Sequence, residues 1–123
     1  MSRQEVLSTL RAQQAVLHAR FGVARLALFG SVARDEAGQD SDVDLLVEFD
    51  RPVGLFRFME LQSHLEDLLG CGVDLGTPQS LKPRIRDRVL AEAVDVQDAQ
   101  HPGRPSRYAS TLRTYATRSS LAA

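Results

Sequence analysis

Two acidic side chains, Asp42 and Asp44, are the first residues of this 123-residue chain whose spacing suggests chemistry. They enter an apolar run, Val43 to Phe49, that predicts a β-strand. Residues two apart on a strand project to the same face, so these carboxylates would lie side by side without neutralising each other. Mg²⁺ is usually held by one or two carboxylates, while water and substrate phosphates complete its octahedron. The pair therefore predicts a magnesium site and a phosphate-bearing substrate.

A glycine and a serine, Gly30 and Ser31, precede the acidic pair, and ten residues separate Ser31 from Asp42. They follow a second strand-like run, Val23 to Phe29, and a short helix is expected after them. Glycine lets a phosphate approach the backbone, and the amides that follow it, with the Ser31 hydroxyl, can donate hydrogen bonds to phosphate oxygens. Donors and metal would then flank one anion.

A third carboxylate, Asp74, comes from a later short strand, Gly72 to Leu75. If the three strands are neighbours in one sheet, Asp74 can join Asp42 and Asp44. Three carboxylates could hold two ions about 3.5–4 Å apart, which would activate an attacking oxygen and stabilise a leaving pyrophosphate. All three acids are therefore candidate metal ligands and catalytic residues.

The elements that must position these residues can be read from the hydrophobic pattern. Ser2 and Glu5 fit a capping box that starts one amphipathic helix, which Gly22 ends. The remaining elements are a helix over 55–69 closed by Gly70, a helix beginning at Pro83, and a last strand over 94–96. Helices and strands in this order predict an α+β fold with a short sheet.

Composition divides the chain into one domain over residues 1–97 and a basic tail over 98–123, which is expected to be poorly ordered or weakly helical. Residues 1–98 carry 11 basic and 16 acidic side chains, a net charge of −5, whereas residues 99–123 carry four arginines and no acid, a net charge of +4. An acidic body argues against binding to duplex nucleic acid. No apolar run is long enough to span a membrane, so we expect a cytoplasmic protein.

The residues around the acids resemble the minimal nucleotidyltransferases of the polymerase-β superfamily. The family signature is Gly-Ser, ten residues, Asp-x-Asp and a later strand aspartate, and the resemblance covers about residues 1–97. It is carried by the segments 28–34 (LFGSVAR), 41–47 (SDVDLLV), 73–75 (VDL) and 81–83 (LKP). Asp35 departs from the pattern, because the family often has glycine there. The resemblance implies the polymerase-β-like nucleotidyltransferase fold, a short mixed sheet backed by helices.

The resemblance also implies an activity. Many members are antitoxins encoded with a helical HEPN ribonuclease toxin, which they silence by transferring AMP from ATP to a toxin tyrosine. Carried over to this chain, Gly30 and Ser31 would hold the triphosphate, and Asp42 and Asp44 would bind Mg²⁺. Asp74 would ligate metal or activate the acceptor hydroxyl, and Arg34 would lie near phosphate or the partner.

Two other functions stay open for the sequence. The chain could neutralise a toxin by binding alone, or it could modify a small molecule as aminoglycoside nucleotidyltransferases do. Independently of the function, a homo- or hetero-oligomer is possible. The second function needs more chain, or a dimer, to build a drug site.

Overall fold

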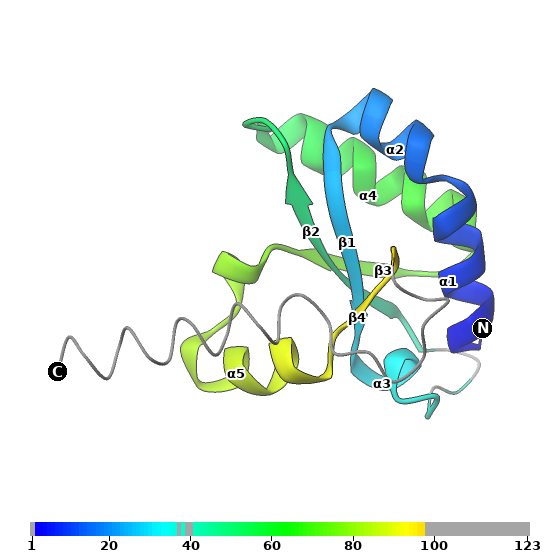
Figure 1. Cartoon of the computed structure of the whole chain (residues 1–123), viewed down its shortest axis with the longest axis vertical. Helices are drawn as coiled ribbons and strands as arrows, with labels where there is room; N and C mark the ends of the chain where they lie inside the picture. The colour runs from blue at the N-terminus through cyan, green and yellow to red at the C-terminus, as the bar shows by residue number, and fades with distance from the viewer. Residues whose placement is uncertain (1, 37, 39–40, 98–123) are drawn as a thin grey trace, which may run out of the picture.

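In the computed structural model, which describes residues 2–36, 38 and 41–97, the first helix begins at the predicted cap (Figure 1). The Ser2 hydroxyl oxygen accepts a hydrogen bond from the Glu5 amide at 3.1 Å. The segment predicted as one helix is two, α1 (Arg3–Ala12) and α2 (Gln14–Phe21), because the chain turns at Gln13 with φ −105° and ψ 5°. Gly22 ends α2 as predicted, in the left-handed conformation with φ +74°.

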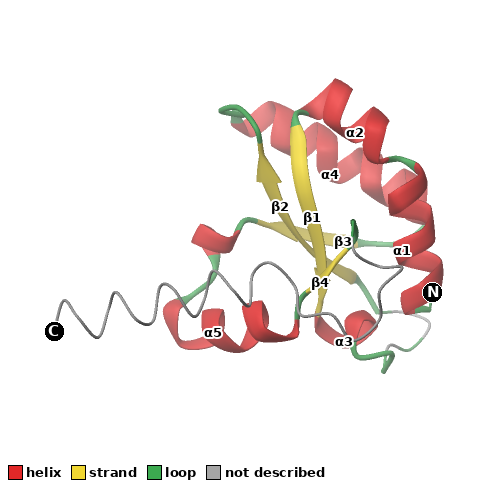
Figure 2. Ribbon diagram, viewed as in Figure 1, coloured by secondary structure: helices red, strands yellow, loops and turns green. Residues whose placement is uncertain are grey.

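Four strands form one mixed sheet in the order β3-β2-β1-β4 (Figure 2). Their bounds are β1 (Val23–Phe29), β2 (Val43–Phe49), β3 (Val73–Gly76) and β4 (Val94–Asp95). β1 runs antiparallel to β2 and to β4, whereas β2 and β3 are parallel. A parallel pair needs a crossover, which α4 (Leu55–Leu69) supplies. The mixed sheet and its helices confirm the predicted α+β fold class.

The two faces of the sheet are covered by different helices. On one face, α1, α2 and α4 bury the main core, to which β2 contributes Leu45 and Val47. On the other face, α5 (Pro83–Glu92) packs over Ala27 and Leu46 through Val89, Leu90 and Ala93. Because alternate strand residues enter different cores, the centre of the sheet is buried on both sides.

Two short helices complete the described chain, α3 (Gly30–Ala33) directly after β1 and the 3₁₀ turn Pro78–Ser80 after β3. The predicted basic tail over 98–123 lies outside the described residues. Within the described part of the chain, no helix is both long and apolar enough to cross a membrane.

Candidate active site

The strand register brings the predicted site residues to one end of β2. Asp44 pairs with Asp74 across the parallel β2/β3 ladder and with Phe29 across the antiparallel β1/β2 ladder. Gly30 follows Phe29, so the glycine turn, Asp44 and Asp74 occupy three adjacent strand ends. Adjacent strands lie about 4.8 Å apart, which places these residues within direct reach of one another.

The alternation of side chains sends all three acids to the same face of the sheet. Asp42 and Asp44 share the parity of Leu46, which belongs to the cluster under α5, whereas Val43 and Leu45 enter the opposite core. Asp74 is flanked in sequence by two residues of that opposite core and therefore projects away from it. This is the face of the sheet that α5 covers, whereas α1, α2 and α4 cover the opposite face.

Two glycines make room for the two carboxylates of the Asp-x-Asp pair. A Cβ atom at Gly30 would collide with the Asp44 carboxylate oxygen Oδ2, and one at Gly72 would collide with Asp42 Oδ1. Gly30 also has φ +75°, a conformation that L side chains rarely adopt. The predicted role of Gly30 was approach to a phosphate; its close contact with Asp44 is an additional constraint. The part played by Gly72 was not anticipated from the sequence.

The electrostatics of the site centre on Asp44. Its pKa is raised from 3.8 to about 6, first by burial and then by repulsion from Asp74, Asp42 and Glu92, with Arg34 acting in the opposite direction. Burial penalises the charged form, and neighbouring carboxylates repel it. The raised pKa shows that these acids share one region of negative potential, which a cation would relieve.

The donor set suits a hard cation, although the side chains do not enclose one as they stand. Among the described residues, no three acidic, histidine or cysteine side chains converge as a metal cluster. Asp42 and Asp44 nonetheless match the small number of carboxylates that Mg²⁺ takes when substrate phosphates supply the other ligands. The roles of Asp42, Asp44 and Asp74 as metal ligands stay predictions.

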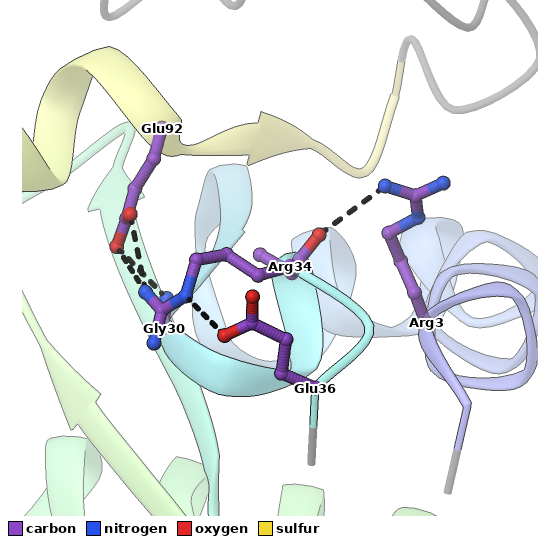
Figure 3. Close-up of polar contacts among 6 residues, drawn as sticks. Arg3, Gly30, Arg34, Glu36 and Glu92 are labelled. Carbon is purple, nitrogen blue, oxygen red and sulfur yellow. Dashed lines mark hydrogen bonds and ion pairs between the residues drawn. The ribbon is translucent and has the colours of Figure 1, made fainter.

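Arg34, expected near phosphate or partner, is engaged by carboxylates of its own chain (Figure 3). Its Nη1 donates to both oxygens of Glu92 at 3.2 Å, and its Nε donates to Glu36 at 3.1 Å. The Gly30 amide also donates to Glu92, at 3.3 Å. The Ser31 hydroxyl makes no hydrogen bond to any residue in the described ranges. Neither glutamate could be found from the sequence, because no motif joins them to the turn.

Asp35, which follows Arg34, has φ +60°. Glycine adopts this left-handed conformation without strain, and aspartate tolerates it better than most residues do. The structure thus explains why glycine is common at this position in the resembling family and why aspartate can replace it.

Comparisons with known proteins agree with this fold. A family model described as a nucleotidyltransferase domain matches residues 10–96. The protein adenylyltransferase MntA of Thermococcus cleftensis is 46% identical over 96 residues, which cover 78% of this chain and 97% of that protein. The structure of a minimal nucleotidyltransferase is 45% identical and superposes with a TM-score of 0.64, covering 76% of this chain and 95% of that chain.

A more distant likeness concerns the fold alone. A structure of a tri-AMPylated Shewanella oneidensis HEPN toxin in complex with its MNT antitoxin matches at 17% identity with a TM-score of 0.57, covering 94% of this chain and 87% of that chain.

The mixed sheet, the glycine turn and the paired aspartates define an enzyme of the nucleotidyl-transferring class. This chain belongs to the nucleotidyltransferase domain family. The resemblance identified in the sequence is therefore confirmed.

Proposed function

We propose that this protein transfers AMP from ATP to a hydroxyl group of a partner HEPN ribonuclease toxin, with tyrosine as the favoured acceptor residue. By this transfer the protein acts as the antitoxin of that partner. The observation that carries the proposal is the strand register, which sets Asp44 beside Asp74 and next to Gly30. Further support comes from a relative named as a protein adenylyltransferase, 97% of which is covered by the match to this chain.

In the proposed reaction, the acceptor hydroxyl oxygen attacks the α-phosphorus of ATP. The bond from that phosphorus to the oxygen that bridges to the β-phosphorus breaks, and pyrophosphate leaves. Asp74, exposed beside Asp44, would accept the hydroxyl proton, and Ser31 would donate to the triphosphate. Mg²⁺ held by Asp42 and Asp44 would supply charge neutralisation at the phosphates. Asp42 and Asp74 are exposed, which suits a macromolecular acceptor that must reach the site from solvent.

Transfer can be tested with labelled ATP, Mg²⁺ and the protein encoded by the adjacent reading frame. We expect that protein to gain label and the ribonuclease activity of the mixture to fall. Asp42→Ala with Asp44→Ala should remove labelling while leaving the complex intact on gel filtration. Glu60→Gln, which alters an acid paired with Arg57 on the surface of α4, is the matched control.

Two results would reject the proposal. Neutralisation that survives the double substitution would indicate an antitoxin that works by binding alone. Label that appears on an aminoglycoside and not on the protein would indicate a small-molecule transferase.

A further inference from the structure

Glu92 links the C-terminal end of α5 to the turn that follows β1. Its carboxylate accepts from the Gly30 amide and from Nη1 of Arg34, so one side chain engages both ends of the short helix α3 (Figure 3). The Glu92 side chain is only 24% exposed, whereas Arg34 is 46% exposed. Glu92 is therefore the more buried partner of this ion pair.

The glutamate is presented by a packed helix. Val89, Leu90 and Ala93 flank it in sequence, and all three are buried against Ala27 and Leu46 of the sheet. Groups that are held by packed regular elements keep a functional geometry better than groups on loops. Glu92 can thus hold the half-exposed Arg34 guanidinium in a fixed position relative to the sheet.

The ion pairs leave part of the Arg34 guanidinium available. Nε is taken by Glu36 and Nη1 by Glu92, while Nη2 has no hydrogen-bond partner among the residues that the structure describes. A planar guanidinium fixed at two nitrogens loses little further freedom when the third binds an anion. Phosphate oxygens are the ligands that such a group recognises best.

We propose that Glu92 is a positioning residue for the nucleotide, which holds Gly30 and Arg34 so that Nη2 of Arg34 meets a phosphate of the nucleoside triphosphate. This inference rests on the proposed function. The negative charge of Glu92 would by itself repel phosphate, but it is paired with Arg34 through both carboxylate oxygens. Its repulsion is therefore largely cancelled at the place where the nucleotide binds.

The test measures binding of a non-hydrolysable ATP analogue with Mg²⁺ by calorimetry. We expect Glu92→Ala to weaken binding about five- to twentyfold, since it removes charge-assisted hydrogen bonds that preorganise the turn. Glu92→Gln keeps the shape of the side chain and one acceptor oxygen, so its loss of affinity for the analogue should be smaller. This variant also provides a folded protein for comparison. In steady-state transfer, the KM for ATP should rise more than kcat falls, whereas Glu60→Gln should change neither.

A double-mutant cycle separates positioning from general stability. In an Arg34→Ala background, Glu92→Gln should change the affinity less than about twofold, because glutamine keeps an acceptor for the Gly30 amide and the arginine that pairs with the lost charge is absent. Tighter binding by Glu92→Gln would overturn the inference and show that Glu92 competes with phosphate. An undiminished loss in the Arg34→Ala background would overturn it as well.

The proposed function fails separately from this inference. A wild-type protein that binds the analogue but labels no partner refutes the transfer to the toxin, and the variants still decide the role of Glu92. A wild-type protein that binds no nucleotide refutes both.

Discussion

Replacing Asp44 with asparagine should stabilise the nucleotide-free protein near neutral pH while it removes transfer activity. In the folded protein the pKa of Asp44 is about 6, against an ordinary value of 3.8, because the side chain is partly buried among other carboxylates. That difference corresponds to about 3 kcal/mol if it is converted in full. Since solvent screens a half-buried group, we expect a gain of about 1–2 kcal/mol in the free energy of unfolding.

The sign of the pH dependence follows from linkage. Between 3.8 and about 6 the folded state binds more protons at Asp44 than the unfolded state does, so the contribution of Asp44 to stability falls as pH rises through this window. Above about pH 6 the full penalty of the charged form is present. The advantage of Asp44→Asn should therefore be complete near neutral pH and should shrink toward zero as pH approaches 3.8.

The assay is urea unfolding, followed by circular dichroism without Mg²⁺, at several pH values between about 4.5 and 7.5. Asp87→Asn makes the same chemical change at an exposed position on α5 and serves as the control. A variant that is no more stable than the wild type near neutral pH would refute the reasoning. An advantage that does not diminish on acidification would refute it too, because another cause of stabilisation would then be at work.

Three further substitutions test the packing that supports the site. Gly30→Ala should lower the free energy of unfolding by about 1–2 kcal/mol, because alanine is strained in the left-handed backbone conformation at this position. It should also remove transfer activity, because the new Cβ displaces the Asp44 carboxylate. Chemical unfolding and the transfer assay measure the two effects, and an active variant would contradict the close contact. Gly72→Ala should impair transfer by displacing the Asp42 carboxylate with a smaller loss of stability, since no left-handed backbone is required there; equal losses for both variants would argue against this distinction. Leu61→Ala, at a fully buried position of α4, should lower the free energy of unfolding by about 2–5 kcal/mol without changing the nucleotide KM of the folded protein, and a changed KM would show that α4 is coupled to the site.

Local features of the fold could be predicted from the sequence because they depend on neighbouring residues. The cap at Ser2 and the stop at Gly22 need only the chemistry of a few adjacent positions, and both are present. The turn at Gln13 was missed although Gln13 and Gln14 interrupt the apolar stripe there, because the apolar residues on either side still fit one helical face.

What the sequence by itself determined about the site is the pairing of Asp42 with Asp44 on one strand face and their distance along the chain from Gly30, since a period of two and a turn residue are local properties. Only the tertiary structure decided that Asp74 lies in register with Asp44, because this depends on how α4 returns the chain to a parallel strand. The contact between Arg34 and Glu92 joins residues 58 positions apart and depends on the packing of α5 against the sheet, which is a sum of many weak apolar contacts that no short motif encodes.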